Sequence, residues 1–114
     1  MHELSYCEGV LEAVLRRAAG RPVSAVGVRV GVRHALLPGA FQQSFALVAD
    51  GTPAAGATTE LTVVPARGRC ARCGAGFDSD GRTDACPACG SVEVTVEGGD
   101  EIVLAWLSYA DGGR

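Results

Sequence analysis

The sequence predicts an α+β fold, in which two helices lie on a small three-stranded mixed sheet and a separate small lobe is inserted before the last strand. Three observations predict it. Apolar residues recur at helical spacing near the start of the chain, a strand, a helix and a strand follow in that order, and two Cys-x-x-Cys pairs interrupt the pattern before a final apolar run.

The first helix is expected over residues 4–19, where six apolar side chains form one stripe: Leu4, Cys7, Leu11, Val14, Leu15 and Ala18. Gly20 and Pro22 end it. Ser5-x-x-Glu8 matches a capping box, so the helix start can shift by a residue or two. Because Cys7 falls on the apolar stripe, we expect a buried small side chain there rather than a functional thiol.

Residues 23–33 alternate with a period of two, which predicts a strand. Its valines share one face, and Gly27 and Gly31 lie on the other, where they predict that something packs very close. A second helix opens at Pro38, carries Phe41, Phe45 and Val48 on one side, and ends before Gly51.

The second strand is expected over residues 58–64, stopped by Pro65. A strand, helix and strand in succession imply a right-handed crossover between two parallel strands. Residues 102–109 form the last strand, and because they are apolar on both faces we expect them to be buried in the main sheet.

Four cysteines predict a zinc ribbon: Cys70, Cys73, Cys86 and Cys89. Each Cys-x-x-Cys turn aims two thiolates at one point, and two such turns complete the tetrahedron that Zn²⁺ prefers. Gly74 and Gly90 follow the pairs, where backbone freedom is needed. No export signal is visible, so reduced cytoplasmic thiols, and hence zinc rather than disulfides, are expected. Four thiolates leave no open position for water, so this zinc is structural.

The chain therefore divides into a main domain, residues 1–65 plus 99–114, and a zinc-ribbon domain, residues 66–98. A net charge of −3 argues against a dedicated nucleic-acid binder. No apolar stretch reaches the ~20 residues of a membrane helix, so no membrane partner is expected. No set of side chains resembles a catalytic site, and we predict no enzyme activity.

The start of the chain offers a second metal site. An initiator methionine before a residue as large as His2 is retained, which leaves the Met1 amine next to an imidazole. That amine, the following amide nitrogens and the imidazole can surround a square-planar ion such as Ni(II) or Cu(II). On spacing alone the signal is weak, because a histidine at position 2 is usually an ordinary solvated terminal residue. His34, the other histidine, is either a surface residue or an accessory donor.

Several motifs together resemble the HypA family of nickel metallochaperones, which mature [NiFe]-hydrogenases. These are the Met1-His2-Glu3 start, Cys-x-x-Cys-Gly-x-x-Phe from Cys70 to Phe77, Cys-Pro-x-Cys-Gly-Ser from Cys86 to Ser91, and Gly-Asp-Glu from Gly99 to Glu101. The resemblance covers nearly the whole chain.

The resemblance implies that nickel is bound by Met1, His2 and Glu3, and that zinc is structural. It also implies two partners, a nickel-handling maturation GTPase and the hydrogenase large subunit, and a monomer or weak dimer. Some family members carry an acidic residue before the second helix, but residues 33–38 contain no carboxylate, so His34 is the alternative donor there. The competing hypothesis is a zinc-ribbon protein-interaction module without metal transfer.

Overall fold

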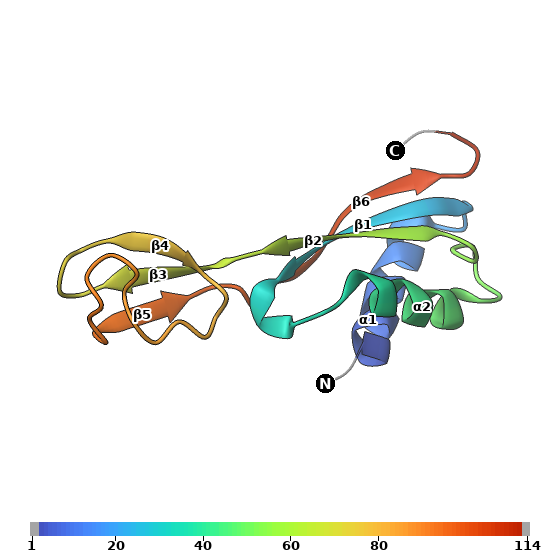
Figure 1. Ribbon diagram of the computed structural model, residues 1–114. Coiled ribbons are helices and arrows are strands. Elements are labelled where there is room, and N and C mark those ends of the chain that lie inside the picture. Colours follow the sequence, from blue (N-terminus) through green and yellow to red (C-terminus); the bar gives the residue numbers. More distant parts are fainter. Residues whose placement is uncertain (1–2, 113–114) are drawn as a thin grey trace. The chain divides into compact units, whose positions relative to one another are not determined.

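The computed structural model describes residues 3–112, without the side chain of Glu3 (Figure 1). Its elements are α1 (Glu3–Ala18), β1 (Val23–Gly31), a 3₁₀ turn η1 (Val32–His34), α2 (Pro38–Ala49), β2 (Thr58–Val64), β3 (Ala66–Cys70), β4 (Gly76–Ser79), β5 (Val94–Glu97) and β6 (Ile102–Tyr109). Contacts group the chain into two compact units. The first comprises residues up to 29, 36–62 and from 103 onward, and the second comprises 30–35 and 63–102. The insertion expected at 66–98 lies inside the second unit, which also includes residues 30–35.

The main sheet has the strand order β2-β1-β6 and is mixed, as the sequence predicts. Figure 1 shows β1 and β2 running in the same direction, with α2 between them in the chain, and β6 running in the opposite direction. The helices α1 and α2 pack against each other on one face of this sheet. The core of the first unit is fully buried at Val14, Val26, Val28, Phe41 and Phe45. The two-helix, three-stranded architecture is therefore confirmed.

The helix ends differ slightly from the predicted ones. Because α1 already begins at Glu3, Ser5 lies inside the helix and does not form the capping box. The second helix begins at Pro38 and ends at Ala49. The Thr52 N–H then donates to the Ala49 carbonyl at 3.0 Å, and Gly51 takes a φ of +78°, so a type II turn follows the helix.

The strand β1 stops two residues before the predicted end. Residues Val32–His34 turn into a 3₁₀ helix, which the Ala35 N–H closes by donating to the Val32 carbonyl at 3.1 Å. The Arg33 side chain favours this turn, because its guanidinium donates to the Gly98 carbonyl at 2.7 Å and to the Val96 carbonyl at 3.1 Å. A valine–arginine alternation continues through residue 33, but these contacts outweigh it.

The expectation that β6 is buried in the main sheet is wrong. The strand lies at the sheet edge, and Leu107 is its only buried residue, while Val103 and Ala105 are exposed. An apolar run on both faces is typical of a central strand, but a three-stranded sheet has two edges and one of them falls here. The expectation of close packing over the glycines of β1 is confirmed. The Trp106 ring covers Gly27, and the backbone of Gly99 and Asp100 covers Gly31.

The second unit contains a small antiparallel sheet with the order β4-β3-β5. In its register Gly68 pairs with Phe77 on one side and with Val96 on the other. Few side chains are buried between residues 63 and 102, namely those of Ala66, Cys70, Ser79 and Cys86. Val30, which belongs to the same unit, is the only other buried side chain within residues 30–35 and 63–102. A core this small needs another source of stability, and two of its five members are cysteines.

Candidate metal centre

Two loops with the same local geometry carry the four cysteines. The first follows β3, and its Gly74 N–H donates to the Cys70 carbonyl at 3.0 Å; in the second, the Gly90 N–H donates to the Cys86 carbonyl at 2.8 Å. Both glycines have a φ of +78°, a backbone conformation that residues with a side chain rarely adopt. This confirms the expectation that the residue after each Cys-x-x-Cys pair needs backbone freedom.

Backbone amides also point at the sulfur atoms within each loop. The Cys73 N–H donates to Cys70 Sγ at 3.4 Å, and the Ala88 N–H donates to Cys86 Sγ at 3.3 Å. Donors of this kind stabilise a thiolate more than a thiol. These amides were not among the residues predicted from the sequence, although the Cys-x-x-Cys-Gly spacing that produces the turn is the signal for them.

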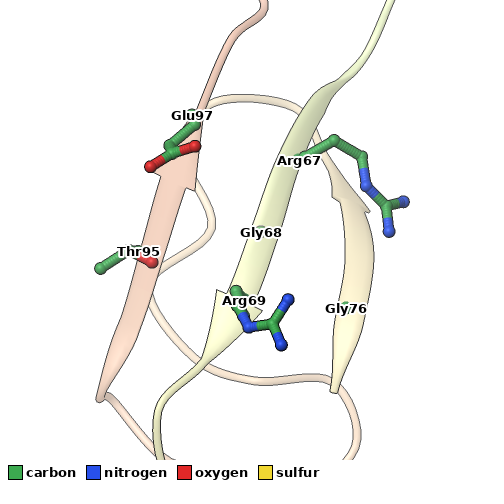
Figure 2. A pocket seen from close by; sticks show the side chains of 6 residues that line it. All are labelled: Arg67, Gly68, Arg69, Gly76, Thr95 and Glu97. Atoms are coloured by element: carbon green, nitrogen blue, oxygen red, sulfur yellow. The ribbon is translucent and has the colours of Figure 1, made fainter. Parts of the chain in front are cut away.

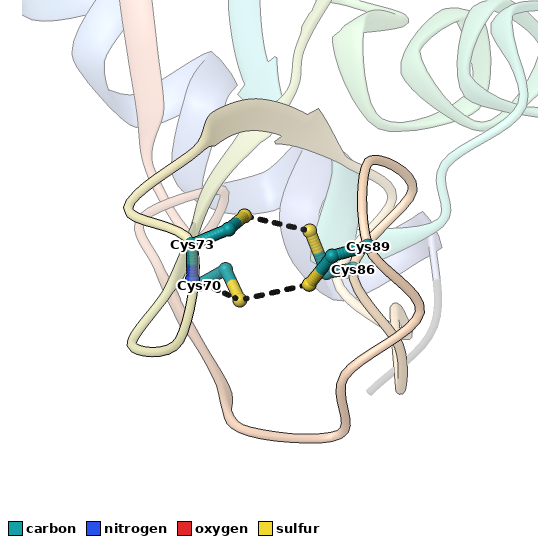
Figure 3. A group of neighbouring side chains, drawn as sticks. All are labelled: Cys70, Cys73, Cys86 and Cys89. Atoms are coloured by element: carbon teal, nitrogen blue, oxygen red, sulfur yellow. Dashed lines mark hydrogen bonds between the residues drawn. The ribbon is translucent and has the colours of Figure 1, made fainter.

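The two loops face each other and bring the four sulfur atoms together (Figure 3). Cys70 Sγ lies 3.7 Å from Cys89 Sγ, Cys73 Sγ lies 3.7 Å from Cys86 Sγ, and all four atoms lie within 4.8 Å of one another. A tetrahedral Zn²⁺ with bonds of about 2.3 Å requires sulfur atoms about 3.8 Å apart. All four cysteines are free rather than disulfide-bonded. The donor set and its spacing therefore fit a tetrahedral metal ion that prefers thiolates.

The acid–base properties of the four cysteines also favour a bound cation. The Cys73 backbone amide lowers the pKa of Cys70 to about 6. At Cys89 the Ser91 amide lowers the pKa, but partial desolvation and the neighbouring cysteine side chains raise it more, to about 12. Four thiolates so close together repel one another, so without a metal ion at least one sulfur keeps its proton at neutral pH.

The shell is partly exposed, since Cys70 and Cys86 are buried while Cys73 and Cys89 are exposed. It is nevertheless complete, because four sulfur donors fill a tetrahedron and leave no position for a substrate or a water. A closed shell of four thiolates is typical of structural metal centres.

Two arginines, Arg69 and Arg72, are neighbours of the first cysteine pair in sequence. Arg69 precedes Cys70 in β3, so their side chains point to opposite faces of the sheet. Figure 2 shows Arg69 on the polar face with Arg67, Thr95 and Glu97. Arg67 pairs there with Asp78, at 2.6 Å between Nη1 and Oδ1. Arg69 therefore belongs to the polar surface and not to the thiolate shell, and Arg72 is also exposed.

The other candidate residues lie apart from this cluster. Within residues 3–112 the only group of three or more potential metal-binding side chains is the four cysteines. A ring nitrogen of His34, Nε2, lies 2.7 Å from the Asp100 carbonyl oxygen. Cys7 is buried, as predicted, and its thiol donates to the Phe41 carbonyl at 3.4 Å. The predicted nickel ligands Met1 and His2, and the side chain of Glu3, lie outside the described residues.

No helix within residues 3–112 is long and apolar enough to cross a membrane.

Among families of known proteins, the model described as "Hydrogenase/urease nickel incorporation, metallochaperone, hypA" matches residues 1–109. The chain is 36% identical over 102 residues to a hydrogenase maturation factor HypA of Geobacter metallireducens, covering 90% of this chain and 93% of that one. It is 35% identical over 110 residues to the HypA of Acidithiobacillus ferrooxidans, covering 94% and 97%.

Among solved structures, the solution structure of the Ni metallochaperone HypA from Helicobacter pylori has a TM-score of 0.60 with this chain. The two share 21% sequence identity, and the match covers 96% of this chain and 97% of that one. At this level of identity the similarity supports the fold alone.

Proposed function

The chain belongs to the HypA family of hydrogenase/urease nickel-incorporation metallochaperones, and on that premise we propose that it binds Ni(II) at its N-terminus and delivers it to a [NiFe]-hydrogenase large subunit. The observation that carries this proposal is the family match over residues 1–109, which begins at Met1-His2-Glu3. In this proposal a nickel-handling GTPase is the partner in delivery, the protein works in the cytoplasm, and it is a monomer or a weak dimer.

The chemistry of the N-terminus suits an exchangeable nickel site. An α-amine, amide nitrogens and the His2 imidazole form a nitrogen donor set, and square-planar nitrogen coordination favours Ni(II) over Zn²⁺. These donors bind only when deprotonated, so nickel affinity falls as the pH drops through the pKa of the imidazole. A site of this kind can release its ion on a change of environment.

The four cysteines have the complementary role in this proposal. Thiolates bind Zn²⁺ tightly, and the sulfur–sulfur distances of 3.7 Å suit it. Cys70, Cys73, Cys86 and Cys89 would therefore hold a structural zinc that stays in place while nickel is transferred. Because the two donor sets differ, nickel would bind at the N-terminus and zinc at the four cysteines.

Nickel titration of the zinc-loaded protein with its native N-terminus tests the proposal. We expect one nickel ion to bind, and we expect a single glycine placed before Met1, or His2→Ala, to abolish binding without loss of zinc. The matched control is His34→Ala, which removes the other histidine and should retain nickel binding. Equal nickel affinity with and without the added glycine would contradict the N-terminal site and favour the alternative, an interaction module that does not transfer metal.

A further inference from the structure

The strand β6 itself carries none of the residues that usually protect a sheet edge. The strand is an end member of the order β2-β1-β6, and its eight residues, Ile102–Tyr109, include no charged residue and no proline. Edge strands commonly carry lysine, proline or other interruptions, because their unpaired backbone groups can otherwise accept a further strand. This edge is therefore chemically suited to strand addition (Figure 1).

A groove of 510 Å³ lies beside this strand. We name it the β6 groove, and it is lined by Arg17, Arg21, Ala105, Trp106, Leu107 and Tyr109. The lining from β6 is apolar and aromatic, whereas the two residues from the end of α1 and the turn after it are both arginines. The groove thus combines an unprotected strand with a positively charged wall.

Of the two arginines that line the β6 groove, Arg17 is the one without a carboxylate partner among residues 3–112. Its Nη2 donates to the Leu104 carbonyl of β6 at 3.2 Å, which holds the guanidinium against the strand. Arg16 pairs with Glu12 and Arg21 pairs with Asp111, but within residues 3–112 no carboxylate pairs with Arg17. A ligand in the β6 groove would therefore meet an uncompensated guanidinium held against β6.

Arg21 is held in place at the other end of the groove. Its guanidinium carbon lies 3.8 Å from the centre of the Tyr109 ring, and its Nη2 donates to Asp111 at 2.8 Å and to the Gly112 carbonyl at 3.2 Å. These contacts fix the end of β6 and neutralise much of the Arg21 charge. The positive charge that can select a ligand in the β6 groove is therefore that of Arg17.

We infer that the β6 edge binds an extended acidic segment of a partner protein, which adds to the sheet as a strand and places a carboxylate against Arg17. Backbone hydrogen bonds supply affinity in strand addition, and side-chain contacts supply selectivity. Self-association is disfavoured, because antiparallel pairing of two β6 strands would bring the Arg17 side chains of both copies near the middle of the pair. The inference goes beyond nickel delivery and does not depend on a bound metal.

Trp106 is the only tryptophan of the chain and reports directly on the groove. The probe is an end-blocked octapeptide of alternating valine and glutamate, titrated into the full zinc-loaded protein while Trp106 fluorescence and amide exchange are measured. We expect saturable binding and slower exchange of amides in β6. Two control peptides carry lysine in place of glutamate, or N-methyl groups on alternate amides, and neither should bind.

Arg17→Glu should weaken peptide binding by about tenfold or more, since it reverses the charge that selects the peptide. Arg16→Glu is the matched control: it changes the net charge equally but lies outside the groove, and should alter binding by less than about twofold. If Arg17→Glu perturbs the fold, Arg17→Gln removes the charge with a similar shape. Nickel titration of each variant separates loss of docking from loss of metal binding.

Several outcomes would overturn the inference. These are binding of the lysine or N-methylated peptide as tightly as the glutamate peptide, binding unchanged by Arg17→Glu and Arg17→Gln, or binding without protection of β6 amides. Protection of those amides that rises with protein concentration and needs no peptide would show instead that a second copy occupies the edge.

Discussion

The indole ring of Trp106 occupies the space where a side chain at residue 27 would begin. A Cβ on Gly27 would lie 2.1 Å from Trp106 Nε1 and 2.2 Å from Cε2, far inside van der Waals contact. The central strand β1 therefore needs glycine here so that a residue of the edge strand can lie flat across it. This contact joins two strands that are distant in sequence.

We expect Gly27→Ala to destabilise the protein by about 1–3 kcal/mol, because the indole must move to admit a methyl group. Gly9→Ala is the matched control. Gly9 lies inside α1 with no atom near its Cβ position, so alanine there should stabilise by about 0.5–1 kcal/mol. Urea unfolding of the zinc-loaded protein measures both. In Trp106→Ala protein the cost of Gly27→Ala should largely disappear, and an undiminished cost would disprove the steric explanation.

Gln42 joins α2 to the start of β2, and its removal should be costly. Its Oε1 accepts from the Thr59 N–H at 2.6 Å and from the Thr59 hydroxyl at 2.9 Å, and its Nε2 donates to the Ala57 carbonyl at 3.3 Å. Gln42→Ala leaves these partly buried groups without partners, at a cost of about 1–3 kcal/mol. The exposed neighbour Gln43 provides the control, since Gln43→Ala should have little effect in the same unfolding measurement. Equal effects of the two substitutions would show that the Gln42 contacts do not matter.

Metal removal should disorder the second unit and leave the first folded. The buried side chains between residues 63 and 102 are only Ala66, Cys70, Ser79 and Cys86, whereas Phe41 and Phe45 fill the core of the first unit. After chelation we expect β3 amides to lose protection from hydrogen exchange while those in the middle of β1 keep theirs. Retained protection in β3 would mean that the metal is dispensable for the fold.

Metal affinity at the four cysteines should rise with pH. Without metal the pKa of Cys89 is raised to about 12, so that thiol is protonated at neutral pH and must lose its proton when the ion binds. Proton release on binding strengthens binding as pH rises, by about tenfold per pH unit for each proton released. Competition with a zinc dye at pH 6.5 and 7.5 measures this slope, and an affinity independent of pH would rule out the protonated thiol.

Arg21 should lower the pKa of Asp111 in the folded protein. The largest cause is the hydrogen bond that the Arg21 guanidinium donates to the Asp111 carboxylate. Desolvation raises the pKa, and the attraction between the two charges lowers it further. A carboxyl with a depressed folded-state pKa stabilises the fold above its unfolded-state pKa, and this contribution is lost as pH falls through the folded value. Because both groups are exposed, the effect on stability is small, and the direct measurement is an NMR titration. In Arg21→Ala the Asp111 pKa should rise, whereas an unchanged value would refute the pairing.

Much of the fold could be predicted because its signals are local. The apolar stripe predicted α1 to within one residue at each end, and Thr58–Val64 was predicted in full. The cysteine spacing correctly placed two facing turns, since each turn is built within five residues. The prediction failed at Val32 and Arg33, where contacts with Val96 and Gly98 override the strand pattern, and it failed for the burial of β6.

The sequence by itself determined the two helices, the three strands of the main sheet, the thiolate donor set and, through its motifs, the family, because periodicity, turn chemistry and ligand spacing are properties of neighbouring residues. It did not predict β3 or β4 in the second unit. Only the tertiary structure decided which strand lies at the sheet edge, that Trp106 covers Gly27, and that the Arg17 guanidinium bonds to the Leu104 carbonyl of β6. Each of these joins residues 79 or more positions apart, or depends on the order of strands. Local patterns carry no information about such pairings, because pairing depends on which surfaces remain to be covered once all the elements have packed.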